Sequence, residues 1–513
     1  MQQWISKLRT QRARAQLRDA GKSAPLEEVR PWHLRLWDLS LGLLGWLAAC
    51  IMLYAENPWP RDPASMVQYT GNALFLLLGI MICATFLRIV NAQILQGQSK
   101  HILLLVLLSI FTLIPVRLLF YAADTGLLAR STAQFLLPLA FGPMLATILV
   151  NSGAGAVLGL WTAFAAAIFA GHSFTVLTTG LITTGVAVYA ARDVHKRSQM
   201  FKAGLMIGVA QVYVVVAMAA LNLTAPDIVL RQVIACLLNG MITTLSVLLV
   251  LPLFETVFDS TSDITLLELS DLSHPLLQRL ALEAPGTYHH SLLVANLAQT
   301  AAAEIGANGL LVRIGAYFHD IGKLSKPELF IENNLATNIH DELAPSMSAL
   351  LITAHVKEGI GLAMLGNLPR IIIDMIQQHH GTSLVAYFHH RAKMQLKQRN
   401  ELEHKLPPTA VNEGDFRYAG PRPKSREAAI IMLADTVEAA SHSLAKPTAG
   451  HLQTLVDEVV YNKIRDGQLD DCHMRIDDLA AIRESFIFTL TSMFHNRIPY
   501  PKNEYSADQP STG

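Results

Sequence analysis

The sequence predicts an all-α protein in which a helical, membrane-embedded half precedes an all-helical soluble half. Of its 513 residues, 51% are hydrophobic and only 16% are charged, well below the roughly 25% charged share of a soluble domain. The charged residues are scarce between Trp37 and Phe254 and frequent after Asp259. Period-two alternation, the pattern of half-buried strands, is almost absent from the soluble half.

The amino-terminal segment, residues 1–35, is too long and too charged to be a cleavable signal peptide. Its cationic side chains are Lys7, Arg9, Arg12, Arg14, Arg18, Lys22, Arg30 and Arg35. A solvated basic tail and an amphipathic helix lying on the anionic inner leaflet both fit this composition. Either interpretation places the start of the chain in the cytoplasm.

Eight apolar stretches have the length of a membrane span, which is roughly 20 residues. They lie at residues 36–55, 71–94, 102–122, 135–151, 154–170, 174–191, 203–223 and 233–254. Glycines such as Gly153 and Gly155 are the main separators in the middle of this region. We therefore expect a transmembrane domain over residues 36–254 with seven or eight helices.

The charge of the loops orients these spans. The loop that carries Arg192, Lys196 and Arg197 is basic and should be cytoplasmic. The loops at residues 56–70, 124–134 and 224–232 are poorer in excess positive charge and fit outside. Eight spans then return the soluble half to the cytoplasm, whereas seven would conflict with the charges. We expect a multi-pass protein of the bacterial inner membrane, in contact with the lipid bilayer, with its amino terminus and soluble half cytoplasmic.

Beyond the last span, residues 255–283 are predicted to form a helical connector, with cap candidates around Asp263. Apolar helical periods follow at residues 288–305, 310–324, 346–365, 369–379, 383–400, 426–444 and 450–466. They predict a soluble domain over residues 284–498, followed by a disordered tail over residues 499–513. A loop rich in Pro and Gly at residues 405–424 carries Arg417 and Tyr418, and long loops of this kind are often functional.

Composition excludes two classes of site. The formal net charge is zero, so nothing global indicates a nucleic-acid partner. The cysteines are Cys50, Cys83, Cys236 and Cys472, and no two of them form a C-x-x-C pair. The sequence therefore predicts neither a disulfide framework nor a cysteine metal site.

The strongest chemical signal is His319-Asp320-Ile321-Gly322-Lys323, near the end of an apolar helix, with His379-His380 further along the chain. Imidazole and carboxylate together suit Mn, Fe or Zn, and two such ions about 3.5–4 Å apart favour in-line attack on a phosphodiester. Neighbours on a helix diverge by about 100°. His319 and Asp320 would therefore approach one cluster from two sides, and the carboxylate has two oxygens with which to bridge two ions.

Three further residues are ligand candidates. His290 is one, with His289 competing for the role, and His355 is another. Asp435 lies in an apolar run, where a charge needs a partner such as a metal. Lys323 would extend a cation towards phosphates held near the metals. His389, His390 and His442 are interpreted as surface or supporting residues.

These motifs resemble those of the membrane-bound HD phosphohydrolases of the PgpH type. The matching residues are 284–291, 319–323, 330–333, 379–382, 416–421 and 434–440, and the resemblance extends over nearly all of residues 263–496. It implies a helical HD domain that hydrolyses cyclic di-AMP to linear pApA with two divalent transition-metal ions, Mn or Fe first among them.

The resemblance also implies roles for residues. One ion would take His290, His319, Asp320 and Asp435, and the other would take the bridging Asp320 with His355, His379 and His380. Asp320 and Lys323 would be catalytic, and Lys323, Arg417 and Tyr418 would contact the substrate. The implied partners are a cyclic dinucleotide and the bilayer, with a homodimer as a further option and no nucleic acid.

The sequence departs from the family in one respect. The family carries a large extracellular domain between its first and second spans, and here that interval is only residues 56–70. Three alternatives stay open: hydrolysis of cyclic di-GMP, hydrolysis of a dNTP or another nucleotide, and a non-catalytic membrane receptor with an HD binding module. No Gly-Tyr-Pro follows His379-His380, which argues against the first.

Overall fold

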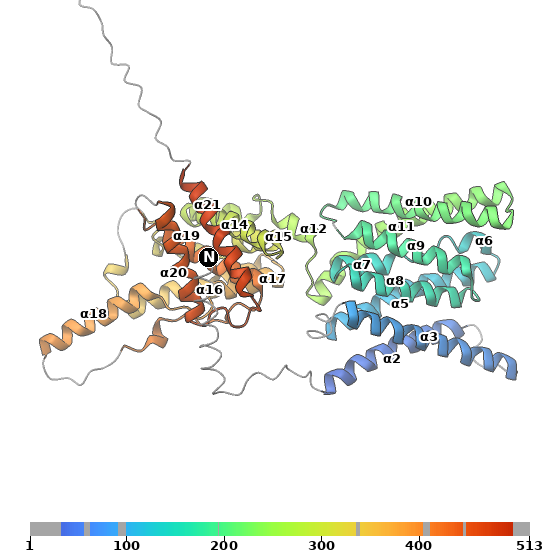
Figure 1. Cartoon of the computed structure of the whole chain (residues 1–513), viewed down its shortest axis with the longest axis horizontal. Coiled ribbons are helices and arrows are strands. Elements are labelled where there is room, and N and C mark those ends of the chain that lie inside the picture. Colours follow the sequence, from blue (N-terminus) through green and yellow to red (C-terminus); the bar gives the residue numbers. More distant parts are fainter. Residues whose placement is uncertain are drawn as a thin grey trace, which may run out of the picture. The chain divides into compact units, whose positions relative to one another are not determined.

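The computed structural model describes residues 32–55, 62–90, 99–192, 194–334, 339–403, 411–444 and 448–495. Within these ranges the regular elements are all helices, and the pairing of Leu384 with Arg417 is an isolated bridge (Figure 1). The predicted all-α fold is confirmed. The predicted basic segment over residues 1–35 falls largely outside the described residues, and the predicted tail over residues 499–513 falls wholly outside them.

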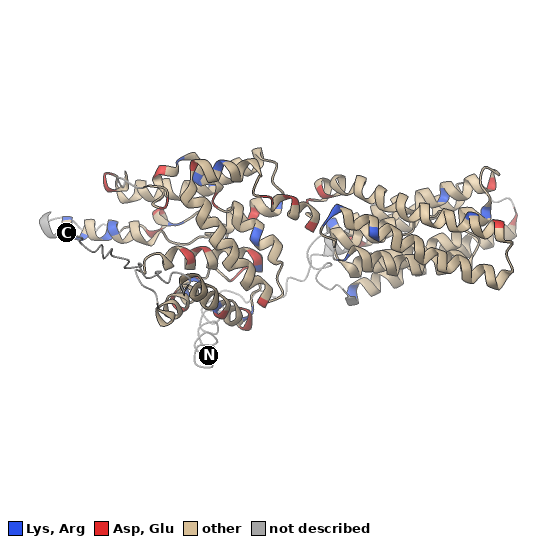
Figure 2. Ribbon diagram, turned by 90° about the horizontal axis from the view of Figure 1, so that it is seen from above, with Lys and Arg blue, Asp and Glu red and all other residues tan. Residues whose placement is uncertain are grey.

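The described chain divides into two compact units, an N-terminal helical unit up to Glu268 and a C-terminal helical unit from Leu269. Figure 2 shows that most of the helix length in the first unit is uncharged, whereas charged residues of both signs recur through the second. The boundary falls inside the predicted connector.

The N-terminal helical unit is a bundle of long apolar helices. They are α2 (Trp32–Tyr54), α3 (Pro63–Val90), α5 (Ser99–Asp124), α8 (Ser152–Phe169), α9 (Phe174–Ala191), α10 (Arg197–Asn222) and α11 (Pro226–Phe258), with the short α6 (Arg130–Ala133) and α7 (Phe141–Leu149). Several begin at a recognisable signal: the Asn151 and Ser173 side chains cap α8 and α9, and α11 starts with Pro226.

Among the described residues, seven helices are long and apolar enough to cross a membrane. Six are α3, α5, α8, α9, α10 and α11, which match six of the predicted spans. The seventh, α16 (Pro345–Leu365), belongs to the C-terminal helical unit and packs there against other helices. The first predicted span corresponds to α2, whose apolar part Asp38–Tyr54 is shorter.

The prediction of one continuous span over residues 135–151 is wrong. The chain forms α6, passes through a non-helical stretch at residues 134–140, and re-enters a helix only at α7. Pro138 explains the break, because proline has no N–H and disfavours a helix just before it. The Asn239 side chain donates to the Leu137 carbonyl at 3.0 Å. The Asn239 side chain thus replaces the backbone N–H that would have bonded the Leu137 carbonyl in an unbroken helix.

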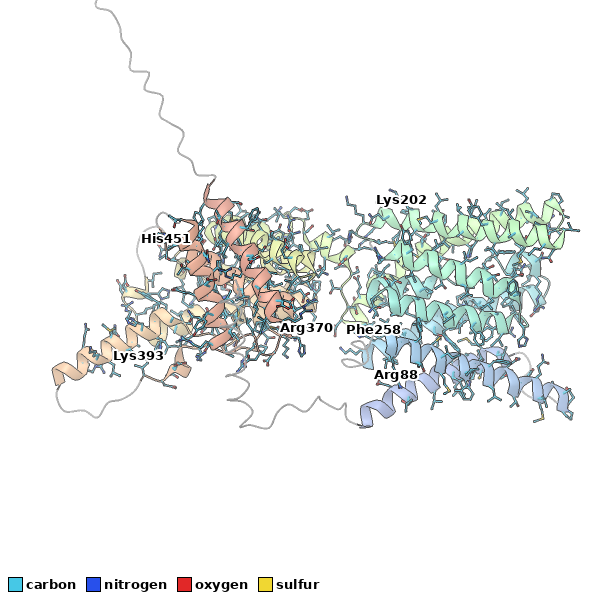
Figure 3. The ribbon with its side chains drawn as sticks, viewed as in Figure 1. Arg88, Lys202, Phe258, Arg370, Lys393 and His451 are labelled. Atoms are coloured by element: carbon cyan, nitrogen blue, oxygen red, sulfur yellow. The ribbon has the colours of Figure 1, made fainter. Side chains whose placement is uncertain are left out.

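One end of the N-terminal helical unit gathers the basic α9–α10 loop and the exit to the soluble half. Arg197 forms an ion pair with Glu268 at 2.7 Å, and His195 lies 3.6 Å from Asp263. Figure 3 places Arg88, in the last turn of α3, towards the same end of the bundle as Phe258, the last residue of α11. The chain therefore leaves the bundle on the side of the basic loop.

Helix α12 (Asp263–Leu269) ends at the border between the units, and the first helix wholly within the C-terminal helical unit is α13 (Pro275–Glu283). Its other elements are α14 (Pro285–Glu304), α15 (Gly309–Phe318), η1 (Ile321–Ser325), η2 (Pro327–Leu329), η3 (Ile339–Asp341), α16, α17 (Arg370–Gln378), α18 (Ala386–Glu403), η4 (Glu413–Phe416), α19 (Arg426–Ser441), α20 (Ala449–Arg465) and α21 (Ile476–His495). The sequence analysis missed α21. Helix α14 packs against α15, α19 and α21, and the run Ala428–Ala434 of α19 is fully buried among them.

Candidate dinuclear metal centre

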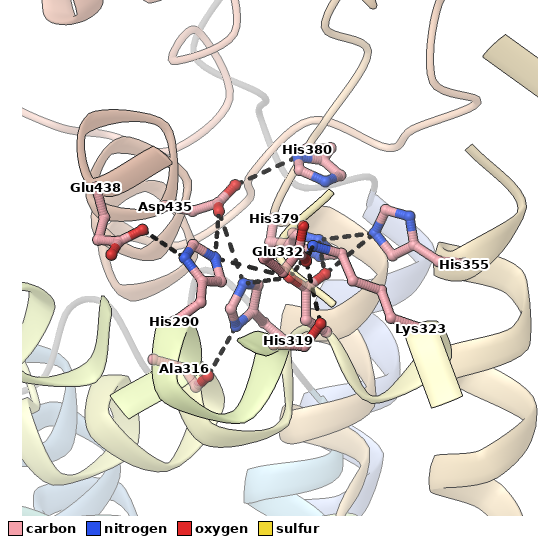
Figure 4. Close-up of polar contacts among 12 residues, drawn as sticks. His290, Ala316, His319, Lys323, Glu332, His355, His379, His380, Asp435 and Glu438 are labelled. Atoms are coloured by element: carbon pink, nitrogen blue, oxygen red, sulfur yellow. Dashed lines mark hydrogen bonds and ion pairs between the residues drawn. The ribbon is translucent and has the colours of Figure 1, made fainter. Parts of the chain in front are cut away.

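Five helices of the C-terminal helical unit bring the seven predicted ligand residues together (Figure 4). Helix α14 carries His290, the end of α15 carries His319 and Asp320, α16 carries His355, the end of α17 carries His379 and His380, and α19 carries Asp435. His289 is exposed and stands outside the cluster, so the geometry resolves the competition in favour of His290.

The His-Asp motif occupies a sharp turn rather than a helix interior. Helix α15 ends at Phe318, and the chain tightens into the 3-10 turn η1 after Asp320, where a helix over residues 310–324 was predicted. Gly322 makes this turn possible. A Cβ added there would lie 1.8 Å from the His355 carbonyl oxygen. The missing side chain lets α16 approach the turn, which brings His355 to Asp320.

The two oxygens of Asp320 face different histidines. Oδ2 lies 3.3 Å from His319 Nε2 and 3.7 Å from His290 Nε2. Oδ1 lies 3.3 Å from His355 Nε2 and 3.7 Å from His379 Nε2. Asp320 therefore stands between two sets of nitrogens, as a bridging carboxylate would.

Asp435 also spans the cluster. Its Oδ1 lies 3.0 Å from His290 Nε2 and 3.7 Å from His319 Nε2, and its Oδ2 lies 3.5 Å from His380 Nδ1. Two groups result, each with ligand atoms within 4.8 Å of one another. We call them the first ligand group (His290, His319 and Asp435) and the second ligand group (Asp320, His355, His379 and His380).

A shared hydrogen-bond pattern aims the imidazoles inward. His319, His355 and His379 each direct Nδ1 to the carbonyl three residues earlier, at 2.7, 2.6 and 2.7 Å. A proton on Nδ1 leaves the Nε2 lone pair free to face the centre. His290 uses the Glu438 carboxylate in the same way, at 2.5 Å.

The donor set fits metal cations. His319 Nε2 and Asp320 Oδ1 are buried and have no hydrogen-bond partner among the described residues, although buried polar atoms are almost always bonded. The separations of 3.0–3.7 Å suit neighbouring ligands that each lie about 2.0–2.2 Å from one ion. Imidazole and carboxylate are ligands that Mn, Fe and Zn accept.

The electrostatics divide the histidines. Burial disfavours a charge on His290 and His319, but the adjacent carboxylates outweigh it and raise the pKa of His290 to about 9 and that of His319 to about 10. Burial prevails at His355, whose pKa falls to about 4, and at His380, whose pKa is well below its ordinary value. The negative charge that favours a proton on the first pair equally favours a metal cation.

The predicted substrate contacts differ in their surroundings. Lys323 Nζ lies 2.7 Å from Asp320 Oδ2 and 2.7 Å from Glu332 Oε1, so two carboxylates already hold it. The Tyr418 ring packs against His380 in a tilted arrangement, with ring centroids 4.2 Å apart. Arg417 does not line the cavity at the site. Its guanidinium is held by Glu413, Asp466 and the Thr382 carbonyl, which gives it a structural place and leaves no support for a substrate contact.

A cavity of about 760 Å³ opens onto the cluster. His290, His355, His380 and Asp435 reach its wall, together with Lys323 and Tyr418. Sequence reasoning missed the partners Glu332 and Glu438 and the cavity residues Ser383 and Lys463. Helical spacing could have found Glu438, which lies three residues after Asp435 on one helix face. No motif marked Lys463.

Comparison with known proteins gives matches along most of the chain. The model of a 7TM receptor with intracellular HD hydrolase matches residues 66–262, and the HD domain model matches residues 287–440. The HD domain implies divalent metal binding, and the matched range contains all seven residues of the cluster.

Two curated relatives are named cyclic-di-AMP phosphodiesterase PgpH. The one from Listeria monocytogenes is 34% identical over 85% of this chain and 59% of its own length, and the one from Bacillus subtilis is 32% identical over 84% and 60%. The chain thus spans about 60% of the length of these relatives. A crystal structure of the Listeria PgpH HD domain in complex with cyclic di-AMP is 42% identical, covers 44% of this chain and 100% of that one, and has a TM-score of 0.40.

Proposed function

Because this chain belongs to the membrane-bound HD phosphohydrolase family of the PgpH type, we propose that it hydrolyses cyclic di-AMP to linear pApA with two divalent ions, Mn or Fe. The observation that carries the proposal is the placement of Asp320 between two histidine sets, at 3.3 Å from both His319 and His355. The names of the curated relatives support the nucleotide.

In this proposal the first ligand group with Asp320 holds one ion, and the second ligand group holds the other. Bound there, the ions would activate a water for attack on phosphorus and neutralise charge on the phosphate. The P–O bond to the ribose 3′ oxygen breaks, which opens the ring and leaves a 5′ phosphate. Asp320 fixes the spacing of the two groups, because each of its oxygens faces a different set of nitrogens.

The surrounding residues orient and polarise the site. Glu438 and three backbone carbonyls hold the imidazoles in one tautomer. Burial disfavours a charge on Lys323, but Asp320 and Glu332 on either side of it outweigh this effect, raise its pKa and keep it cationic. Two of its three N–H donors serve these carboxylates, and the third would donate to a phosphate oxygen held at the metal site. The cavity volume of about 760 Å³ lies within the usual range of small-ligand sites.

We also propose that the catalytic unit faces the cytoplasm of a bacterial inner membrane. The ion pair of Arg197 with Glu268 ties the basic α9–α10 loop to the connector. By the positive-inside rule that loop is cytoplasmic, and the connector leaves the bundle on the same side. The proposed domains keep the predicted bounds: residues 36–254 in the membrane, 255–283 as connector and 284–498 as the HD domain.

The test is product analysis of the purified full chain with Mn²⁺, using cyclic di-AMP and cyclic di-GMP side by side. We expect pApA from cyclic di-AMP, and at least about a hundredfold less from Asp320→Ala. Asp471→Ala, which removes an exposed carboxylate, is the matched control and should behave as wild type. Turnover by Asp320→Ala at the wild-type rate would refute the role of Asp320 in holding the metal ions. A preference for cyclic di-GMP would refute the proposed specificity for adenine.

A further inference from the structure

A second cation, Lys463, lines the cavity and takes no part in the metal cluster. It lies on the last turn of α20, and its Nζ donates to Ser383 Oγ at 2.8 Å. No carboxylate in the described part of the chain forms an ion pair with it. Lys323 differs, because Asp320 and Glu332 both lie 2.7 Å from its Nζ. Lys463 is thus the cavity lysine whose charge is not already neutralised.

The carboxylate nearest along the helix is engaged elsewhere. Asp466 accepts from the Arg417 guanidinium at 2.8 and 3.1 Å and from the Gln468 amide at 2.9 Å. These contacts hold Asp466 against the loop that follows η4. Arg417, which the sequence suggested as a substrate contact, is instead an ion-pair partner of Asp466.

The partner hydroxyl is also fixed in place. Ser383 follows the turn after His380, and its carbonyl accepts from the Tyr418 N–H at 3.1 Å. The preceding residue, Thr382, bonds through its N–H to Gln468 at 2.9 Å. Ser383 Oγ and Lys463 Nζ thus form a preorganised pair on the wall of the cavity, which Tyr418 also lines.

The buried ammonium of Lys463 would be stabilised by a bound anion. Burial lowers its pKa from the ordinary lysine value, and the fields of Asp435 and Asp466 only oppose this effect. A partly buried ammonium bonded to a neutral hydroxyl is costly until a negative group approaches it. The open side of this ammonium is the cavity itself.

We propose that Lys463 and Ser383 form an anion subsite that binds the second, non-reacting phosphate of a cyclic dinucleotide. The inference rests on the proposed function, which places the reacting phosphate at Asp320. A cyclic dinucleotide carries two phosphates, and the cavity offers a separate cation for the second. Apolar side chains such as Phe330, Ile352 and Leu384 line other parts of the wall and suit the nucleobases.

The last turn of α20 suggests a rival role for Lys463, because cations there stabilise a helix C-terminus. Arg465 occupies the same turn and is exposed. If Lys463 only stabilised the end of the helix, Arg465 would have the same role. Arg465 does not line the cavity, however, so it could not bind a phosphate there. Arg465→Met is therefore the matched control for Lys463→Met, since both remove one positive charge from one helical turn.

The experiment compares the full-length wild type, Lys463→Met, Lys463→Arg and Arg465→Met with bound metal measured in each. The substrates are cyclic di-AMP, cyclic di-GMP and bis(p-nitrophenyl) phosphate, a diester with a single phosphate. We expect Lys463→Met to raise KM about 10- to 100-fold for the cyclic dinucleotide that wild type hydrolyses, with KM for the single-phosphate diester changed less than about twofold. Lys463→Arg should recover part of the loss, and Arg465→Met should match wild type.

Equal losses on the cyclic dinucleotide and the single-phosphate diester would overturn the subsite, as would unchanged KM values or an Arg465→Met effect of the same size. Wild type that hydrolyses only the single-phosphate diester would overturn the proposed function and the subsite together. If wild type prefers cyclic di-GMP, only the proposed specificity for adenine is overturned. A selective effect of Lys463→Met on cyclic di-GMP would then still support the subsite.

Discussion

At the scale of single residues, the site depends on groups that hold the ligand side chains rather than on the ligands alone. Three histidines are oriented by carbonyls of their own helices, which no side-chain substitution can remove. His290 is the exception, because its Nδ1 bonds to the Glu438 carboxylate. Glu438 is buried and also accepts from His442 at 2.7 Å. It is therefore the orienting contact most open to mutation.

Glu438→Ala should weaken Mn²⁺ binding about 10- to 100-fold, because His290 loses the acceptor that sets its tautomer and direction. The change in affinity is measured in an equilibrium titration with Mn²⁺, in which the electron paramagnetic resonance signal of the free ion decreases as the ion binds. Glu458→Ala removes an exposed carboxylate of α20 and is the control. An affinity equal to wild type in Glu438→Ala would exclude an orienting role.

The two ligand groups should differ in their response to pH. In the metal-free protein His290 and His319, with pKa values of about 9 and 10, hold protons at neutral pH. An ion entering the first ligand group must displace them, so its affinity should rise with pH up to that range. His355, with a pKa of about 4, is already neutral at pH 7. His355 should therefore add little pH dependence to the affinity at the second ligand group between pH 8 and about pH 5.

Calorimetric titration in buffers of different ionisation enthalpy separates the two cases. We expect one loading step that releases about two protons near pH 7 and one that releases fewer. Two steps with the same pH dependence would contradict the division of the cluster.

At the scale of elements, the turn from α15 into η1 and its contact with α16 set the position of Asp320. Gly322 permits this contact, and an added Cβ would also meet the Gly359 nitrogen at 2.5 Å. Both atoms belong to the backbone of α16, so no flexible side chain can move aside. The interface must open if the glycine is replaced.

Gly322→Ala should lower the free energy of unfolding of the C-terminal helical unit by about 1–3 kcal/mol and reduce metal occupancy of the second ligand group. Thermal release of bound Mn²⁺ from the full chain measures both effects. Gly361→Ala, at an open position of α16, is the control and should be neutral or slightly stabilising. Similar release profiles for the two variants would contradict the close-approach argument.

The elements also show what the sequence could and could not predict. Apolar length located six of the expected spans, because a bilayer requires about 20 apolar residues whatever the neighbours do. The same criterion failed at residues 135–151, where Pro138 breaks the helix and Asn239, about a hundred residues later, bonds the freed carbonyl. The His-Asp motif identified the cluster. The helix predicted through residue 324 was too long, because contact with α16 rather than local propensity sets the turn.

Long-range contacts explain the remaining gaps. Lys463 and Ser383 meet across 80 residues of chain, and nothing in the pattern around Lys463 distinguishes it from a helix-terminal lysine. Arg417 stood out because it lies in a loop of unusual composition, yet its partner Asp466 lies 49 residues away along the chain. A sequence shows which side chains can carry chemistry, whereas the fold decides which of their charges remain unpaired.

At the scale of the whole molecule, a short connector joins the N-terminal helical unit to the C-terminal helical unit, where the metal cluster lies. Glu255, near the end of α11, accepts from the Ser262 N–H at 2.7 Å and from the Thr265 hydroxyl at 2.9 Å. These bonds fix the turn by which the chain leaves the bundle.

The central claim is that two bound metal ions in one His/Asp cluster hydrolyse a cyclic dinucleotide. The most direct test is to strip the purified full chain of metal with a chelator, then titrate Mn²⁺ while measuring bound ions and cyclic di-AMP turnover in the same samples. We expect no turnover in the stripped protein and a plateau near two bound ions per chain. Full turnover without metal, or a plateau reached with one ion bound, would contradict the account.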